Sequence, residues 1–543
     1  MLYILFSLLI LFPVFAGFGR LSELFLGKFF EGFSGKIFSG ILSISTFFVG
    51  FTFIFPLNLY LELSTIFIGF SLFFYFKLYQ EFLHFLKFNY RVFSIFTVII
   101  LLFGSFYPFI LDHFGYYVPT IKWLSEIGLV KGISNLDLLL GQMSFWHFLQ
   151  AGFSNFSDVY LRLNAVLMVF YLIYILEKKS WLHLVFFPIL LLFTQSPSPD
   201  LPAIVFSLII LNEILSGNKN TKLLFALSIF VFAIKPTMIW MPIFTLLYSI
   251  FILKSKLKFI IFGSIIFLLF IVKNLYAFGF PVFPVALLDF NLSWKPNIEL
   301  LKISSEIAIQ KTYDMQYSVA QIKSFSSIEY IKNWLFLKGI KSVIHWVFII
   351  SIFIFTVFAF NKKSRIFFFL YISILIKIIL ILLFSAQYRF FIDVFFVIFF
   401  ILFFETFSKN LIFMVTSILT SFAFIGLSFP NLLQNYIPSF KLGHFMSGIT
   451  KNQWLKPARF ELHKFKTYQI GNLKFNVVKN YPFSFDTPIP AISPEYLKED
   501  YDAGIFPQMI SDDLKDGFVW KKLNVEEHQK LAEILKQIKY SDN

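Results

Sequence analysis

The chain has 543 residues, of which 58% are hydrophobic and 83 are phenylalanine, and its mean hydropathy is +0.77. One water-soluble core could not enclose so much apolar surface, so this composition excludes an ordinary soluble domain and predicts a multi-spanning membrane protein. The formal net charge is +15, but the lysines and arginines gather in short connectors between apolar runs, as membrane topology requires, so nucleic acid is not an expected partner. The chain has no cysteine, which excludes disulfides and thiol chemistry.

Apolar runs of spanning length predict an all-α integral membrane bundle of about 14 transmembrane helices. The first run lacks the basic start of a secretory signal, so we expect a retained span with its N-terminus outside. Proline after Lys235 interrupts one stretch, whose halves could form a single broken element. The runs cover residues 1–19, 37–56, 59–80, 92–110, 159–177, 181–196, 200–216, 222–236, 237–254, 257–274, 342–361, 365–385, 388–407 and 410–429.

Basic residues mark alternate connectors between these runs, and the positive-inside rule places those connectors in the cytoplasm. The other connectors and the part of the chain after residue 429 are therefore expected outside. The resulting divisions are N-terminal transmembrane helices (1–110), an extracytoplasmic motif loop with interfacial helices (111–158), a central transmembrane bundle (159–274), an extracytoplasmic helical loop (275–341), C-terminal transmembrane helices (342–429) and a small extracytoplasmic α+β domain (430–543).

Several shorter elements are expected on the outer side. Residues 121–129 and 145–153 have helical spacing but are too short to cross, so they should lie along the outer interface and together roof a cavity. Residues 298–341 have the pattern of amphipathic helices. In the C-terminal domain, residues 468–470 and 473–478 flank Gly471-Asn472 as a predicted hairpin, and residues 525–540 have a helical pattern.

The motif loop opens with an unusual concentration of polar chemistry. A carboxylate directly after the apolar run 92–111 would be costly if it faced hydrocarbon, so it should sit at the membrane surface or line a wet cavity. The purely structural interpretation is an interfacial cap, in which the acid ends a helix and the aromatic residues belong to the aromatic belt at the membrane interface. The residues concerned are Asp112, His113, Tyr116, Tyr117, Lys122 and Trp123.

Other outer segments add a second acid and further cations. Asp200 follows a proline-rich loop and could either be a helix N-cap or meet Asp112 above the bilayer. Lys235 lies between apolar spans, where a lysine usually faces a cavity, whereas Arg389 could simply reach the outer headgroups. An acid that takes a proton from a hydroxyl, with a cation that steadies a phosphate leaving group, is what group transfer from a lipid phosphate needs.

The remaining candidates have two interpretations each. Trp123 and Trp294 could stack on sugar rings, but anchoring at the membrane interface is the favoured explanation for them. His147 and Arg162 are more readily structural. The sequence shows no phosphate-binding glycine loop, zinc spacing or nucleophile elbow, so no metal ligands are assigned.

Several motifs together resemble a bacterial family of multi-spanning envelope proteins to which no activity has been assigned. The matching segments are Asp112 to Trp123, Gly128 to Asp137, the Ser-Pro-Ser-Pro-Asp-Leu-Pro run 196–202, the stretch 279–284 leading to Trp294-Lys295, and Phe485 to Pro490. This chain departs from the family at Tyr117, where other members have histidine, at Asp137-Leu138-Leu139, where they have His-Gly-Arg, and in lacking cysteines in the tail.

That family is in turn similar to the GT-C membrane glycosyltransferases, which carry an acid in the first large outer loop and take sugar from a polyprenyl phosphate. The resemblance implies that Asp112, with His113 beside it, is the catalytic base, and that Arg389, with Lys235 or Lys122, binds the donor phosphate. It implies that Asp200 orients the acceptor or helps to hold a divalent cation, and that sugar or acceptor contacts come from Tyr116, Tyr117, Trp123 and Trp294. Roughly four predicted spans precede the motif loop here, where GT-C enzymes usually have one.

The favoured hypothesis is therefore a GT-C-like enzyme on the outer face of a bacterial inner membrane. Its expected partners are a polyprenyl-phosphate sugar donor, membrane lipids and an envelope glycan, lipid or protein acceptor. The alternatives are an envelope polysaccharide polymerase or ligase, which usually depends on more outer arginines, and a flippase or transporter of lipid-linked sugars, which commonly shows repeated halves.

Overall fold

The computed structural model describes residues 1–404, 406–436, 448–461, 464–479 and 481–538. This part of the chain is mostly helical, with four short strands near its C-terminal end. The helices are α1 (Leu2–Leu26), α2 (Phe33–Phe51), α3 (Leu59–Tyr75), α4 (Leu78–Gly104), α5 (Val118–Glu126), α6 (Phe145–Ala151), α7 (Leu163–Lys178), α8 (Phe187–Leu190), α9 (Asp200–Leu215), α10 (Thr221–Ile234), α11 (Trp240–Leu247), α12 (Ile261–Ala277), α13 (Ile298–Thr312), α14 (Val319–Ser324), α15 (Ser327–Leu335), α16 (Ile340–Asn361), α17 (Arg365–Phe384), α18 (Ile392–Phe403), α19 (Lys409–Ser428), α20 (Pro430–Tyr436), α21 (Pro494–Ala503) and α22 (Val525–Gln537).

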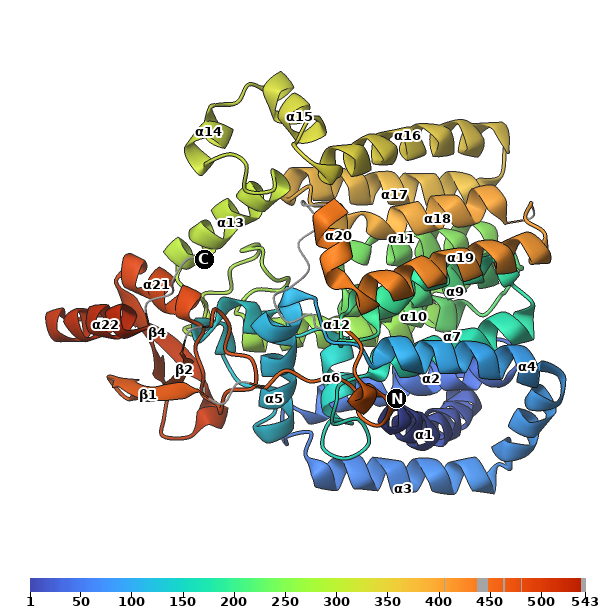
Figure 1. The fold of residues 1–543 in the computed structure, drawn as a ribbon, viewed down its shortest axis with the longest axis horizontal. Coiled ribbons are helices and arrows are strands. Elements are labelled where there is room, and N and C mark those ends of the chain that lie inside the picture. Colours follow the sequence, from blue (N-terminus) through green and yellow to red (C-terminus); the bar gives the residue numbers. More distant parts are fainter. Residues whose placement is uncertain (405, 437–447, 462–463, 480, 539–543) are drawn as a thin grey trace.

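Most of the long helices lie side by side, and the strands, α21 and α22 project from one end of the bundle (Figure 1). Among the described residues, seven helical segments are long and apolar enough to cross a membrane: 2–26, 33–51, 78–104, 257–277, 340–361, 365–384 and 409–428. The other predicted runs also form helices, but these are shorter or broken. A multi-spanning membrane protein is thus supported, with seven candidate spans rather than the 14 that the sequence pattern predicts.

The segment around Lys235 illustrates why some runs are short. Helix α10 ends at Ile234, and Lys235 is extended with φ −147° and ψ 106°. Pro236 then begins a 3₁₀ turn before α11. Proline cannot donate the backbone hydrogen bond that would continue α10, so the break predicted from the sequence is present.

Helices α1 and α2 form the closest helix pair of the N-terminal half. A Cβ on Gly19 would lie 1.6 Å from the carbonyl oxygen of Lys36, and one on Gly40 would lie 1.9 Å from that of Phe15. The two backbones are therefore in direct contact at both glycines, which only a residue without a side chain permits.

The motif loop contains the two short helices α5 and α6. All seven residues of α6 are buried, and this helix packs against α2, α5 and α10. Helix α5 also has a buried face. The sequence predicts that these two helices lie along the outer interface, and that placement stays a prediction; the structure adds that the apolar residues of α6 are enclosed by other helices.

The C-terminal region contains two antiparallel pairs, β1 (Phe465–Ile470) with β2 (Leu473–Val478), and β3 (Ile505–Met509) with β4 (Phe518–Lys522). The predicted hairpin is confirmed: Ile470 pairs with Leu473, and Gly471 takes the left-handed conformation, φ +57°, that the tight turn requires. Helix α22 accounts for the predicted helix over 525–540, of which Tyr540 lies outside the described residues.

This region is anchored on the motif loop. The ammonium of Lys515 donates to the carbonyls of Thr52 (2.9 Å) and Leu129 (2.8 Å). The backbone N–H of Phe518 donates to the carbonyl of Lys131 at 3.0 Å. The end of the bundle that carries the motif loop is therefore also the end covered by the C-terminal strands.

Candidate functional site

Asp112 stands at the start of a π-helical turn, His113–Tyr117, that leads into α5. Its carboxylate Oδ2 accepts a hydrogen bond from Nη1 of Arg389 at 3.0 Å, which closes an ion pair across 277 residues of chain. Arg389 lies in a 3₁₀ turn between α17 and α18. Two connectors at the ends of separate helices thus supply the two halves of this pair.

The second acid is paired in the same way. Asp200 is the first residue of α9, and its carboxylate forms an ion pair with the ammonium of Lys235, the extended residue between α10 and α11. The hydroxyl of Ser198 donates to the other carboxylate oxygen at 3.1 Å. Pro199 occupies the N-cap position, and the Asp200 side chain makes no capping bond, so its partner is the lysine rather than the helix end.

One contact joins the two pairs into a single cluster. The ammonium of Lys235 also donates to the backbone carbonyl of Arg389 at 3.1 Å. The side chains of Asp112 and Arg389 are 31% and 45% exposed, whereas those of Asp200 and Lys235 are 19% and 12% exposed. A ligand can therefore reach the first pair more easily, and the second pair supports it from a more enclosed position.

Two buried tyrosines extend the cluster inward. Tyr116 and Tyr117 lie with their ring centroids 4.6 Å apart, and both rings approach His147, at 6.0 and 5.0 Å. Burial raises the pKa of both phenols well above the ordinary value, and the negative charge of Asp112 raises each further. Both phenols therefore stay protonated, and they interact electrostatically with Asp112 and Asp200.

Sequence reasoning missed a third charged pair close to this cluster. Lys377 of α17 forms an ion pair with Asp393 of α18, and both side chains are buried. The indole Nε1 of Trp240 donates to the other oxygen of Asp393 at 2.8 Å. Lys377 also interacts electrostatically with Lys235 and Asp200. The signal was available: Lys377 interrupts an otherwise apolar run, where an ionisable residue is a functional candidate by default.

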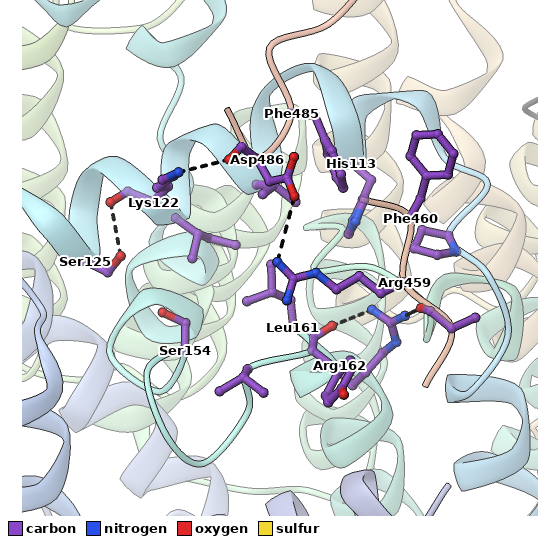
Figure 2. A pocket seen from close by; sticks show the side chains of 16 residues that line it. His113, Lys122, Ser125, Ser154, Leu161, Arg162, Arg459, Phe460, Phe485 and Asp486 are labelled. Carbon is purple, nitrogen blue, oxygen red and sulfur yellow. Dashed lines mark hydrogen bonds and ion pairs between the residues drawn. The ribbon is translucent and has the colours of Figure 1, made fainter. Parts of the chain in front are cut away.

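Other predicted site residues have different surroundings. Lys122 donates to the backbone carbonyls of Asp486 (3.0 Å) and Thr487 (3.1 Å), and it lines a cavity together with His113 (Figure 2). Trp123 is buried against Phe518 of β4. None of these contacts reaches Arg389, so the structure places Lys122 and His113 at a neighbouring cavity and Trp123 in the core beneath the C-terminal strands.

Trp294 lies at a third location. Its indole Nε1 donates to the carbonyl of Leu275 at 2.9 Å, and the ammonium of Lys131 lies 5.3 Å from the centre of its ring. The side chain of Asn135 donates to its backbone carbonyl at 2.7 Å. These contacts tie the 279–294 segment to the motif loop and give the indole a packing role.

The described residues contain no group of three or more histidines and carboxylates arranged to hold a metal ion. The one carboxylate suggested for a divalent cation, Asp200, already has an ammonium against its oxygen. Asp200 and its neighbours therefore do not fit a metal site in this arrangement. The chemistry of the cluster is accordingly that of two acids, two cations and two neutral phenols.

Comparison with known proteins gives a family without an assigned activity. The model of a family described as a domain of unknown function (DUF8201) matches residues 1–396. No curated protein matches the chain, and no solved structure matches it. The match includes Asp112, Asp200, Lys235 and Arg389, together with Lys377 and Asp393.

Proposed function

The chain belongs to this family of unknown function, and we propose that it is a membrane glycosyltransferase of the GT-C kind. It would move a sugar from a polyprenyl phosphate to a hydroxyl of an envelope glycan, lipid or protein. One observation carries the proposal: the loop acid Asp112 lies 3.0 Å from the guanidinium of Arg389, beside the Asp200–Lys235 pair. A proton acceptor and a phosphate-binding cation are thus side by side at the end of an apolar bundle.

The proposed reaction uses these groups in one displacement. The acceptor oxygen attacks the anomeric carbon of the donor sugar, and the bond from that carbon to the phosphate oxygen breaks. The phosphate leaves with the bonding electrons, and its growing charge is neutralised by Arg389 with Lys235 beside it. The hydroxyl proton passes to the carboxylate of Asp112. Asp200 holds Lys235 in position.

The ion pair between Asp112 and Arg389 in the free protein implies an order of events at the site. In the free protein the Arg389 guanidinium is bound to Asp112. A lipid phosphate competes for that guanidinium, because two phosphate oxygens can accept two parallel hydrogen bonds from it, whereas Asp112 accepts one. Donor binding therefore releases Asp112 to act on the acceptor. Without a donor the base stays paired with Arg389.

The proposal extends to the membrane arrangement. Seven helical segments have spanning length, and the shorter apolar helices α3, α7, α9, α10, α11 and α18, with the broken stretch 181–193, would supply the remaining crossings of a 14-span bundle. We place the charged cluster and the C-terminal domain on the outer face of a bacterial inner membrane. The distribution of lysine and arginine supports that orientation.

The test is complementation of a deletion strain, with lipid-linked sugars and surface glycans profiled together. We expect deletion to remove one surface glycan and to leave its lipid-linked donor accumulated. The Asp112→Asn protein should be made at normal levels and should fail to restore the glycan, because an amide cannot accept the proton. Loss of a general base typically costs on the order of 10²–10⁴ in rate.

Glu126→Gln is the matched control, since this acid is the last residue of α5 and its ion pair with Lys122 is long at 3.9 Å. It should restore the glycan fully. Full activity of Asp112→Asn would remove the central assignment.

A transporter of lipid-linked sugars is the second candidate. The buried Lys377–Asp393 pair favours it, because ionisable pairs inside membrane helices often mark transport pathways. The same deletion strain separates the two functions. Loss of a transferase leaves the lipid-linked sugar on the outer leaflet, whereas loss of a flippase leaves it inside, where an external glycosidase cannot reach it.

A further inference from the structure

A cavity of about 220 Å³ lies beside the charged cluster and contains none of its four residues. Its walls come from the motif turn and α5, from the connector 154–162, and from the C-terminal segments 458–460 and 485–486 (Figure 2). Two consecutive residues lie in different places: Asp112 belongs to the charged cluster, where it pairs with Arg389, whereas the ring of His113 lines this cavity. Three cations, Lys122, Arg162 and Arg459, face one carboxylate, Asp486.

The charge of Arg162 is buried, and no carboxylate of the described residues bonds to its guanidinium. The residue is 2% exposed, and its guanidinium donates to three backbone carbonyls, including those of Gly104 (2.8 Å) and Ala458 (2.7 Å). Asp158 attracts it from nearby but accepts the backbone N–H of Arg162 instead. Carbonyl dipoles satisfy hydrogen bonds without neutralising the charge, so the wall of the cavity has a positive potential.

Arg459 supplies a second cation that can turn to a ligand. Its side chain is 47% exposed, and its ion-pair partners are distant, with Glu461 at 3.8 Å and Asp486 at 3.9 Å. Both separations exceed hydrogen-bond length, so the guanidinium fork keeps donors for an incoming group. Figure 2 shows this side chain crossing the middle of the cavity toward Asp486.

His113 provides an unsatisfied polar group at the same place. It is 4% exposed, and its Nδ1 is buried with no hydrogen-bond partner within the described part of the chain. Burial lowers the pKa of this imidazole well below the ordinary value, and the nearby Arg162 and Arg459 lower it further. The ring is therefore neutral and can donate one hydrogen bond to a bound oxygen. A buried polar atom without a partner calls for an occupant of the cavity.

We propose that this cavity is a second binding site, for a small oxyanion of the phosphate or carboxylate class, held by Arg459 and His113 in the positive potential of Arg162. The anion could belong to a phosphorylated lipid headgroup or to a soluble phosphate or acidic sugar, and the two sources share the same recognition chemistry. The site does not depend on the glycosyltransferase proposal, because binding needs no turnover and uses none of the residues assigned to the reaction.

Binding to the purified full-length protein in a phosphate-free detergent tests this site. Inorganic phosphate and short-chain phosphatidic acid are the two probes, titrated separately by calorimetry at constant ionic strength. We expect saturable binding of at least one probe, weakened about tenfold or more in Arg459→Gln because a charge-assisted hydrogen bond is lost. Arg459 is half exposed, so this variant should fold normally. Arg365→Gln is the control, an exposed arginine at the start of α17.

Each outcome of these titrations either supports the second binding site or overturns it. Binding of phosphate alone supports a soluble oxyanion, binding of phosphatidic acid alone supports a headgroup, and binding of both supports the shared site. Absence of saturable binding for both probes, unchanged affinity in Arg459→Gln, or an equal loss in Arg365→Gln would overturn the proposal. Arg389 of the charged cluster can itself bind a phosphate, so the loss of affinity on Arg459→Gln should be the same in an Arg389→Gln background, which keeps this result separate from the test of activity.

Discussion

The Asp200–Lys235 pair shows how single residues at this site combine stability with function. Both side chains are largely enclosed, so removing only one leaves an uncompensated charge. Lys235→Met should therefore lower the free energy of unfolding by about 2 kcal/mol, less than for a fully buried pair because some water reaches it. Thermal unfolding in detergent measures this loss.

The double variant Asp200→Asn with Lys235→Met serves as its control. It removes both charges, so most of the lost stability should return, whereas complementation of the deletion strain should not. If the double variant is as unstable as Lys235→Met, the pair is not what the single substitution disrupts.

Buried acids also lie where the motif loop meets α21. Burial raises the pKa of Asp137 to about 8, and it raises the pKa of Glu499 to about 7 with help from Glu495. These folded-state values lie above the unfolded ones, so the folded protein holds protons that the unfolded chain has lost. The contribution of these two acids to stability is therefore greatest below about pH 4, falls as pH rises, and levels off above about pH 8.

Docking of α21 on Leu138 should accordingly weaken between pH 6 and pH 8, by roughly 1–3 kcal/mol. Hydrogen exchange of the α21 amides, corrected for the intrinsic effect of pH, measures this change. Asp137→Asn keeps an oxygen for the bond from the Leu139 N–H and should remove the part of the dependence due to Asp137, while Glu499 and Asp500, whose pKa values burial also raises, contribute the rest. An unchanged pH dependence in that variant would assign the whole effect to other groups.

At the scale of elements, the backbones of α1 and α2 are in direct contact, and a substitution at that contact tests how closely the helices pack. A Cβ on Gly40 would lie 1.9 Å from a backbone oxygen of α1, so Gly40→Ala must push the helices apart. We expect a loss of at least about 2 kcal/mol in the free energy of unfolding, because overpacking of a tight contact costs on the order of 1–3 kcal/mol. The midpoint of thermal unfolding reports it.

Gly50 provides the matched control, because it lies in the same helix and a Cβ there would meet nothing within 4 Å. Gly50→Ala should be neutral or slightly stabilising, since alanine favours helix by roughly 1 kcal/mol over glycine. Equal losses in both variants would mean that the close contact at Gly40 is not the cause of the loss.

For the whole molecule, the testable property is which face each connector occupies. The natural chain has no cysteine, so single substitutions can be labelled without background. Lys530→Cys, exposed on α22, should react with a membrane-impermeant maleimide in intact cells. Lys363→Cys, exposed between α16 and α17, should react only after permeabilisation. Positive residues remain on the cytoplasmic side, which is the reason for the difference. The reverse pattern would place the charged cluster on the cytoplasmic face.

The sequence alone established the membrane character of the protein, the break at Lys235-Pro236, the hairpin at Gly471-Asn472 and the helical character of the segment that forms α13 to α15. These are local properties, because hydrophobic periodicity and turn chemistry act over neighbouring residues. It also singled out Asp112, Asp200, Lys235 and Arg389, since charge next to apolar spans is costly wherever it stands.

Only the tertiary structure decided which charges meet. Arg389 pairs with Asp112 across 277 residues, while Lys122, ten residues from Asp112, turns to the C-terminal segment instead. The burial of α6 and the Lys377–Asp393 pair likewise arise from packing between helices distant in sequence. Partners of this kind are selected by three-dimensional contacts, and hydrophobic patterning along one chain carries no record of them.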